Sequence, residues 1–537
     1  MCQTNKQQKA NMWEQTQRAA RFVVLSVSLC FLAVLTVLQL ISTASVAYDQ
    51  SEKVKIAAVN PLGTAAISAL ILLLLGGILT AIGKGTPRLG KRGGFGVKTE
   101  RRLFAFFCGL TMVAGVALIF GVGEGLREDP LHVYESAVQL SMRENLTLMP
   151  GGYLFHKAHQ LGLVTYERML GLITFDVRFI FFLNLLFVNG INFLSYKMAD
   201  MVFDHNQRVN LLTICLSYLF VPQFFFVVFA YGLVPGFFFL LLALYLIEKY
   251  FRDEKKRYLV AVVLSLSVAT LLKSNYLIGA IVVAILCVLQ TLRTKKLKAL
   301  LVAVMAVVLP ICCLKLLPLV YEARTGIPAV EGEPMITYVA MGVNPMNEGA
   351  GPGWYDGSNY NWYKNAEYDR ARTIERAEEC LRNCVTVYRT EPVRTAKFFV
   401  RKTISQWCEP LFQSVWSGHL EALGQQAEHP ALRPLFLGEG AEPLLRLWMR
   451  GMLFLIYLSA FLFLWNKGKE AHGLEYAFLF FIGGFLFHLV WEAKSQYIYP
   501  YVFVMIPGCA YLLSDFAEKM KSRKKSKQMV ENIDSTS

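Results

Sequence analysis

Two adjacent carboxylates stand where an apolar stretch of this sequence ends. Glu128 and Asp129 come directly before Pro130, and apolar residues recur at helical spacing over 130–143. Proline suits the first turn of a helix, and the helix dipole favours an ionised carboxylate there. Such a group can accept a proton from a hydroxyl group, or it can simply be a solvated cap on a surface helix. We identify Asp129 and Glu128 as candidate catalytic residues.

Cationic side chains occur at comparable positions. Lys273 follows an apolar run, Arg127 precedes the two carboxylates, and Lys494 lies in a polar segment between two further apolar runs. Cations at such points can hold a phosphate or diphosphate leaving group. A lysine at the end of a span can also be an anchor whose ammonium reaches the interface. We predict donor or phosphate binding for Lys273, Lys494 and Arg127.

Other polar and aromatic residues accompany these charges near the ends of the apolar runs. Aromatic faces can stack on sugar rings, and two histidines three residues apart can be half of a metal site. Hydrogen-bonding or structural histidines are the interpretation that we prefer, so no metal ligand is assigned. The candidate substrate-binding residues are His156, His159, Gln160, Trp354, Tyr355, Glu492, Gln496 and Tyr497.

The composition places the chain in a membrane. Of its 537 residues 55% are hydrophobic and only 17% are charged, which is too apolar for a water-soluble protein of this length. Stretches of about 18 or more nearly uncharged residues can cross the bilayer as helices, because lipid offers no hydrogen-bond partner to an open backbone. We predict an all-α polytopic protein with about twelve spans: 22–47, 62–82, 103–122, 175–196, 211–231, 236–247, 258–272, 278–292, 300–321, 447–465, 474–491 and 498–513.

The distribution of lysine and arginine predicts the orientation. Basic residues gather in 84–102, 249–257, 293–298 and 519–527, which fall on one side if there are twelve spans. The positive-inside rule makes that side cytosolic, with both termini. The net charge of +15 is then explained by topology and anionic lipid, so we expect no nucleic-acid partner.

This topology divides the chain into five parts. Residues 1–102 hold a cytosolic N-terminus, an accessory transmembrane hairpin and a basic linker. Residues 103–321 form a transmembrane core whose first outer loop, 123–174, carries the candidate catalytic residues. An outer region of loops and helices follows at 322–446, with helical spacing over 366–388 and 393–407. The C-terminal transmembrane helices occupy 447–513, and a basic cytosolic tail occupies 514–537.

These motifs resemble those of bacterial integral-membrane glycosyltransferases of the GT-C superfamily, in the branch of protein O-mannosyltransferases and aminoarabinose transferases. The resemblance covers about 103–513. It rests on Glu128-Asp129 after a span, on Tyr-Leu-Phe-His-Lys-Ala-His-Gln-Leu-Gly-Leu at 153–163, and on Pro-Met-Ile-Thr-Tyr-Val-Ala-Met-Gly at 334–342. Pro-Gly-Trp-Tyr at 352–355 and Trp-Glu-Ala-Lys-Ser-Gln-Tyr at 491–497 complete it.

The resemblance implies an inverting transfer of a sugar from a polyprenyl-phosphate donor to an acceptor outside the cytoplasmic membrane, with Asp129 in the position of the general base. The expected acceptor is a cell-envelope glycan, a teichoic-acid-type polymer or a protein. The chain departs from the family pattern in its extra N-terminal hairpin and in the histidines at 156–159, where relatives often have a proline.

Two other classes of function compete with this prediction. A transporter or flippase for lipid-linked saccharides needs many spans and cationic patches, but it usually carries charges near the middle of the membrane. A polysaccharide polymerase or ligase also fits a long outer segment late in the chain. The expected partners are the lipid-linked donor, the acceptor and the bilayer, and the sequence requires no cofactor, although a divalent metal is compatible with the reaction.

Overall fold

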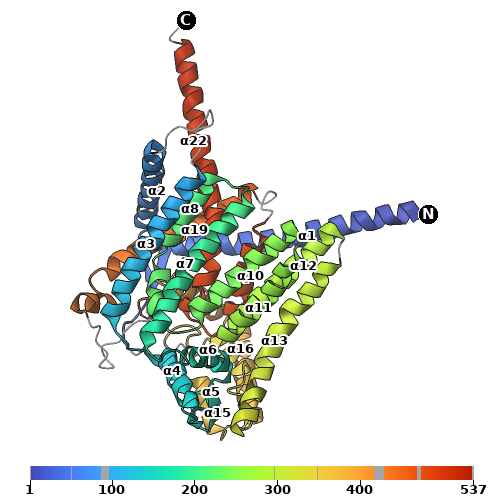
Figure 1. The fold of residues 1–537 in the computed structure, drawn as a ribbon, viewed down its shortest axis with the longest axis vertical. Helices are drawn as coiled ribbons and strands as arrows, with labels where there is room; N and C mark the ends of the chain where they lie inside the picture. Colours follow the sequence, from blue (N-terminus) through green and yellow to red (C-terminus); the bar gives the residue numbers. More distant parts are fainter. Residues whose placement is uncertain are drawn as a thin grey trace.

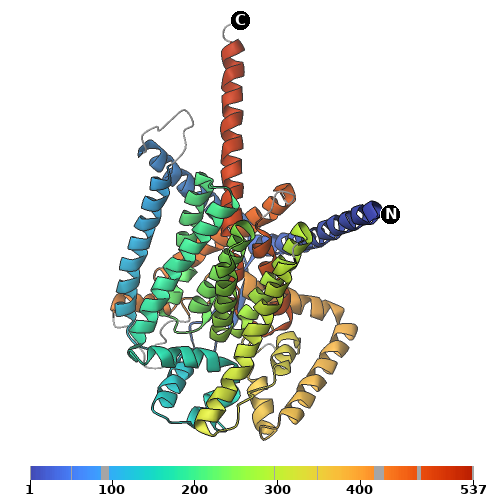
Figure 2. The same ribbon diagram turned by 45° about the vertical axis from the view of Figure 1, so that its right-hand side comes forward.

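The computed structural model describes residues 2–49, 51–85, 96–295, 297–346, 349–416, 429–467 and 473–534. This part of the chain is a bundle of long helices with shorter helices gathered at one end (Figures 1 and 2). Within it, eight helices are long and apolar enough to cross a bilayer, or up to ten if each of two bent pairs counts as one span. The prediction of an all-α polytopic protein is therefore confirmed.

Twelve spans are not confirmed. The predicted spans 258–272 and 474–491 correspond to α11 (Lys256–Leu272) and α20 (Glu475–Val490), which have 17 and 16 residues, fewer than the roughly 20 that cross a bilayer. The predicted spans 211–231 and 498–513 are helix pairs bent by 52° and 47°. In the first pair Pro222 begins the new helix, because proline has no N–H to continue the preceding one.

The first two thirds of the chain build the N-terminal hairpin, most of the bundle and the part at 123–174, which is called the first outer segment after the topology predicted from the sequence. The N-terminal part contains α1 (Cys2–Ile41), β1 (Ser42–Val46), β2 (Val54–Ala58), α2 (Pro61–Gly85) and α3 (Val97–Val122). The first outer segment contains α4 (Glu128–Ser141), η1 (Leu146–Leu148), α5 (Tyr153–His156), η2 (Ala158–Gln160) and α6 (Leu161–Leu170). The bundle continues with α7 (Val177–Val202), α8 (Gln207–Leu219), α9 (Pro222–Phe225), η3 (Phe226–Val228), α10 (Leu233–Asp253), η4 (Ser274–Tyr276), α12 (Leu277–Thr294) and α13 (Lys298–Thr325).

The second outer segment is named in the same way after the predicted topology. It contains α14 (Ile336–Val343), α15 (Ser358–Asn365), α16 (Arg370–Thr390) and α17 (Pro392–Trp407). The C-terminal part contains η6 (Pro430–Leu432), α18 (Arg433–Phe436), α19 (Glu442–Lys467), η8 (Ser495–Tyr497), α21 (Tyr499–Phe503) and α22 (Ile506–Asp534). The helices predicted over 130–143, 366–388 and 393–407 are confirmed as α4, α16 and α17.

The short outer helices lie together although they come from distant parts of the chain. Helices α4, α5, α6, α15 and α16 gather at the end of the bundle opposite to the end from which α22 projects (Figure 1). Asp369 fixes the start of α16, since its carboxylate accepts hydrogen bonds from the first free backbone N–H groups. This end of the bundle therefore carries both outer segments.

The N-terminal hairpin is joined to the outer segments by backbone hydrogen bonds. Strands β1 and β2 pair antiparallel, with Val46 opposite Val54. Ala44 donates its N–H to the Cys408 carbonyl at 3.0 Å, and Val54 donates to the Ala350 carbonyl at 2.8 Å. The predicted first span, 22–47, thus ends earlier, because its last residues form β1.

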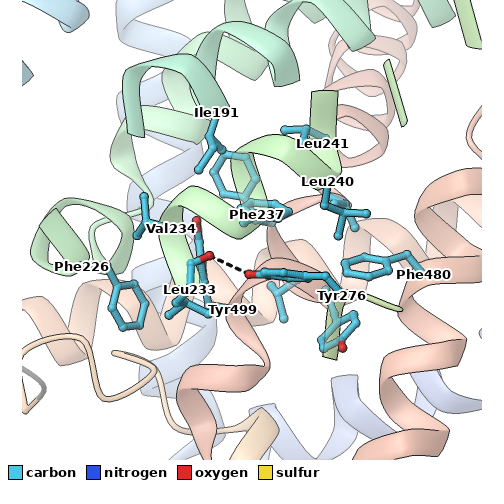
Figure 3. Close-up of a cluster of buried hydrophobic side chains, with 14 of the residues drawn as sticks. Ile191, Phe226, Leu233, Val234, Phe237, Leu240, Leu241, Tyr276, Phe480 and Tyr499 are labelled. Atoms are coloured by element: carbon cyan, nitrogen blue, oxygen red, sulfur yellow. Dashed lines mark hydrogen bonds between the residues drawn. The ribbon is translucent and has the colours of Figure 1, made fainter. Parts of the chain in front are cut away.

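A core of aromatic and aliphatic side chains fixes the ends of α10, η4 and α21 (Figure 3). Tyr276 donates a hydrogen bond to the Leu233 carbonyl at 2.7 Å. A Cβ atom on Gly232 would overlap the carbonyl of Leu272, so only glycine allows the start of α10 to approach the end of α11 so closely. The position of the next residue, Lys273, is set by these contacts.

Candidate functional site

A cavity of about 560 Å³ lies where the two outer segments meet the bundle. The start of α4, the segment from α5 to η2 and the turn between β1 and β2 form part of its wall. The end of α11, the loop before α14 and the segment 491–497 form the rest. Every catalytic or binding residue predicted from the sequence lines this cavity except Trp354.

Asp129 is held by two tyrosine hydroxyls. Tyr153 donates a hydrogen bond to Asp129 Oδ1 at 3.1 Å, and Tyr231 donates to Oδ2 at 3.4 Å. Burial raises the pKa of Asp129, but the charges of Lys494 and Lys157 and the Tyr153 hydrogen bond outweigh it, so the pKa lies below its ordinary value. Asp129 is therefore an ionised proton acceptor at neutral pH.

Glu128 begins α4 with a φ of 50°, in the left-handed region that residues with a side chain rarely adopt. Glu52, in the turn between the two strands, has a φ of 47°. Both carboxylates line the cavity. Conformations of this kind cost about 1 kcal/mol or more, so the surrounding structure must hold both residues in place.

Lys273 sits between two aromatic rings beside Asp129. Its Nζ lies 4.6 Å from the ring centres of both Tyr231 and Tyr497. Burial lowers the pKa of Lys273 to about 7, although Asp129 opposes this shift. Lys273 thus changes charge near neutral pH and can bind an anion in its protonated form.

Lys494 lies between several carboxylates. Its Nζ is 3.1 Å from Glu52 Oε1. Burial lowers the pKa of Lys494, but Glu52, Glu492 and Asp129 outweigh burial and raise it above its ordinary value. Burial raises the pKa of Glu492 to about 7 despite the opposing charge of Lys494. Lys494 therefore stays positive, while Glu492 can either donate or accept a hydrogen bond near neutral pH.

The other predicted binding residues contact polar and aromatic neighbours that the sequence analysis had not assigned to the site. Gln160 donates to the Tyr231 hydroxyl, and Gln496 N–H donates to Gln413 Oε1 at 3.4 Å. Tyr355 is 39% exposed, with its ring centre 5.9 Å from Lys157 Nζ. The ring of Trp491 stacks on that of Tyr338, with centroids 5.5 Å apart and an interplanar angle of 2°.

Trp354 differs from its prediction. Its side chain is only 1% exposed, and its Nε1 donates to Ser405 Oγ at 2.9 Å. It packs behind the cavity wall against Val46 and Trp416, and of these three residues only Trp416 lines the cavity. A buried indole cannot stack on a sugar in the cavity, so the predicted binding role of Trp354 is wrong and the residue instead stabilises the wall.

The two predicted histidines have different surroundings. His156 Nδ1 is 3.6 Å from Glu333 Oε1, whereas the ring of His159 meets the edge of Tyr338. Burial, with the charge of Lys157, lowers the pKa of His159 to about 4, so its ring is neutral at neutral pH. Among the described residues, no group of three or more histidine, cysteine or acidic side chains has the arrangement of a metal site.

Glu333 is a buried carboxylate that the sequence analysis missed. It binds Lys157 Nζ at 2.9 Å, the Tyr338 hydroxyl at 2.8 Å and Asn359 Nδ2 at 2.7 Å. Burial raises its pKa, but the contacts with His156 and Lys157 outweigh burial and lower it to about 2. Glu333 therefore ties the second outer segment to the first. In the sequence, the only feature that could have pointed to Glu333 is that it directly precedes the motif that begins at residue 334.

No protein-family model matches this chain, and no curated protein does. The chemistry of the site is therefore argued from its geometry. An ionised carboxylate, Asp129, faces a cavity whose wall includes Lys157, Lys273 and Lys494 together with several tyrosines. Such a site can bind a phosphate-bearing ligand and accept a proton from a hydroxyl group next to it.

Proposed function

We propose that this protein is a membrane glycosyltransferase that transfers a sugar from a polyprenyl-phosphate donor to an acceptor hydroxyl on the outer face of the cytoplasmic membrane. Asp129 accepts the proton of the acceptor hydroxyl as its oxygen attacks the anomeric carbon of the sugar. The bond from that carbon to the phosphate oxygen breaks, and the polyprenyl phosphate leaves with the electron pair. Attack from the face opposite to the leaving phosphate inverts the anomeric centre.

The observation that carries this proposal is the setting of Asp129. Two tyrosine hydroxyls hold its two oxygens, and Lys494 and Lys157 keep it ionised inside a cavity of about 560 Å³. General bases contribute about 100- to 10,000-fold to rates when they are within hydrogen-bond reach of the proton. A carboxylate with a fixed position and a free volume beside it meets this condition.

Lys273 and Lys494 are proposed to bind the phosphate that leaves. Lys273 follows α11 and precedes η4, at the ends of two helices of the bundle, so a phosphate attached to a lipid can reach it from the membrane. The charge of Asp129 raises the pKa of both lysines, which supports a phosphate position close to the proposed base. Fixed cations stabilise the negative charge that develops on the leaving group.

The sugar is proposed to lie against the aromatic wall. Tyr355 and the stacked pair of Tyr338 and Trp491 offer faces for a sugar ring. His156, His159, Gln160, Glu492, Gln496 and Tyr497 supply polar groups on the same cavity wall for sugar hydroxyls. Pockets with aromatic surfaces and a few fixed polar groups are typical of small-ligand sites.

The outer location is supported by the separation of charges along the bundle. Elements that line the cavity, such as α4 and α5, lie at the end of the bundle opposite to the projecting α22, whose sequence includes the basic cluster at 519–527 (Figure 1). Lysine and arginine favour the cytosolic side of bilayers, which supports the proposal that the cavity faces outward. In this orientation the acceptor is a cell-envelope glycan, a teichoic-acid-type polymer or a protein.

Mass analysis of cell-envelope glycans and lipid-linked sugars, with the protein present and absent, tests this proposal. We expect one sugar substituent to disappear from an envelope polymer or protein in cells without it, while its lipid-linked donor accumulates in the outer leaflet. Accumulation in the inner leaflet would instead indicate a flippase and contradict the proposal. An unchanged glycan and lipid profile would contradict it as well.

A further inference from the structure

Arg127 is a buried cation whose hydrogen-bonding capacity is mostly unused. Its side chain is 2% exposed, and its guanidinium carbon lies 3.6 Å above the centre of the Trp416 ring. Nη1 donates to the Trp416 carbonyl at 2.9 Å, which fixes the guanidinium in place. Its Nε and Nη2 have no hydrogen-bond partner among the described residues, and neither has Nε1 of Trp416.

Three unpaired donors from two touching side chains are rare in a folded protein. A buried donor without an acceptor costs about 1 to 3 kcal/mol, so nearly all such groups are paired. Here both side chains line the cavity, so a ligand in it can provide the acceptors. A single group with several oxygens fits this arrangement best.

Arg127 also has no directly paired carboxylate among the described residues, although the charges of Glu128, Glu52 and Asp49 act on it from beyond ion-pair distance. Within the part of the chain that the structure describes, no acidic group lies within ion-pair distance of Arg127, and the nearby Glu52 pairs with Lys494 instead. Burial lowers the pKa of Arg127 to about 10, while Glu128 and Glu52 oppose this shift. The ligand that fits is therefore an anion, and arginine recognises oxyanions with two parallel hydrogen bonds.

This region is distinct from the one around Lys273. The charges that act most strongly on Arg127 are those of Glu128, Glu52 and Asp49, whereas Asp129 and Lys494 act on Lys273. Arg127 stands at the start of α4 beside the turn between β1 and β2, and Lys273 stands at the end of α11. The two cations therefore stand on different elements of the cavity wall.

We propose that Arg127 and Trp416 form a second oxyanion subsite, separate from the one at Lys273, which binds a phosphate or carboxylate of the acceptor. This assignment rests on the proposed function, in which Lys273 and Lys494 take the donor phosphate. It replaces the donor-binding role that the sequence suggested for Arg127. It also narrows the acceptor to an anionic polymer or an acidic segment of a protein.

The fluorescence of Trp416 gives a direct test. The emission of Trp416 is the difference between the wild-type protein and Trp416→Phe, and it is followed while inorganic phosphate is added to the purified full-length protein. We expect a saturable change whose Kd rises at least about tenfold in Arg127→Gln, because the charge of the guanidinium and its free Nε and Nη2 donors are lost. In Lys273→Gln the Kd should stay within about twofold. Sodium chloride at equal ionic strength should give no change.

Other outcomes separate the alternative explanations. If the Kd for phosphate is the same in Arg127→Gln as in the wild type, the proposed subsite is wrong. This conclusion holds whether or not the protein transfers sugars. If Arg127→Gln does not fold, as judged by gel filtration and thermal melting, Arg127→Lys replaces it, and an unchanged Kd in that variant would also overturn the proposal. The titration is repeated with inorganic diphosphate as the probe. If Arg127→Gln and Lys273→Gln raise the Kd for diphosphate equally, one diphosphate contacts both Arg127 and Lys273. The proposal of a separate acceptor subsite would then be wrong.

Discussion

Glu52 Oε1 lies 3.1 Å from Lys494 Nζ, although the two residues are 442 positions apart in the chain. Glu52 belongs to the turn of the N-terminal hairpin, and Lys494 belongs to the polar segment between α20 and η8. The charge of Lys494 acts in turn on Asp129 and lowers its pKa. The N-terminal hairpin is thus linked to the candidate base through one side chain.

Replacing Glu52 tests this link. In Glu52→Gln, Lys494 loses its nearest carboxylate and is free to move toward Asp129 and Glu492, so we expect transfer to fall about tenfold, which corresponds to about 1.4 kcal/mol. Glutamine keeps the backbone conformation, whereas glycine would also relieve the positive φ. The control is Lys53→Gln in the same turn, because the side chain of Lys53 is exposed and does not line the cavity, and this variant should transfer sugar at the wild-type rate. Equal rates in Glu52→Gln and the wild type would show that the pair has no role.

The charge of Lys273 predicts a pH dependence of donor binding. With a pKa of about 7, the free site loses its positive charge as the pH rises through 7, so donor affinity should fall by up to about tenfold per unit above that pH. This decrease of donor affinity with pH should be absent in Lys273→Gln, which should bind the donor weakly at every pH.

Binding of a polyprenyl-phosphate sugar to purified protein in nanodiscs, measured from about pH 6 to about pH 9, on either side of the Lys273 pKa, checks this expectation. Lys364→Gln on the exposed side of α15 is the matched control. A slope that persists in Lys273→Gln would assign the titration to another group and return Lys273 to the role of an interfacial anchor.

Glu333 should contribute stability that depends on pH in the acidic range. Its pKa in the folded protein is about 2, against an ordinary value of 4.5, so this contribution is complete above about pH 4.5 and is lost as the pH falls toward 2. The shift corresponds to about 3 kcal/mol. Glu333→Gln should therefore melt several degrees below the wild type near neutral pH, and the difference should shrink as the pH approaches 2.

Thermal melting at neutral pH and at two acidic values measures this difference. Glu331→Gln is the control, because Glu331 is 69% exposed and pairs at the surface with Arg370. Glu331→Gln should melt at the same temperature as the wild type at each pH, since exposed ion pairs contribute little to the free energy of unfolding. Equal melting temperatures of Glu333→Gln and Glu331→Gln at neutral pH would contradict this role of Glu333.

Much of this architecture could be predicted from the sequence, because the bilayer imposes long apolar helices and places charges at their ends. Asp129, Lys273 and Lys494 all stand at such ends, and the cavity brings them together. The number of spans was predicted less well, since hydropathy alone does not reveal that a run such as 211–231 breaks at Pro222.

Contacts between distant segments could not be predicted. Glu52 and Glu333 are single acidic residues in polar loops, and only the folded chain places them against Lys494 and Lys157. Trp354 is next to Tyr355 in sequence, yet consecutive side chains in a loop point in different directions, so one is buried and the other lines the cavity. The two residue types are equally suited to stacking on a sugar. Only the packing of the folded chain shows that the ring of Tyr355 reaches the cavity and that of Trp354 does not.

The orientation of the bundle is tested by labelling from outside the cell. In a cysteine-depleted background, a membrane-impermeant thiol reagent should modify Glu135→Cys on α4, whose side chain is about half exposed, and should not modify Lys255→Cys between α10 and α11. Permeabilised cells should give modification at both positions. Modification of Lys255→Cys alone in intact cells would invert the topology and place the cavity in the cytosol.

The most direct test of the proposed mechanism is the rate of sugar transfer by Asp129→Asn in proteoliposomes supplied with a polyprenyl-phosphate sugar and an envelope acceptor. Asparagine keeps the shape of the side chain but cannot take up the proton, so the rate should fall at least about 100-fold. Glu135→Gln, on the same helix and outside the cavity, should keep the wild-type rate. Transfer by Asp129→Asn at the wild-type rate would contradict the assignment of Asp129 as the general base.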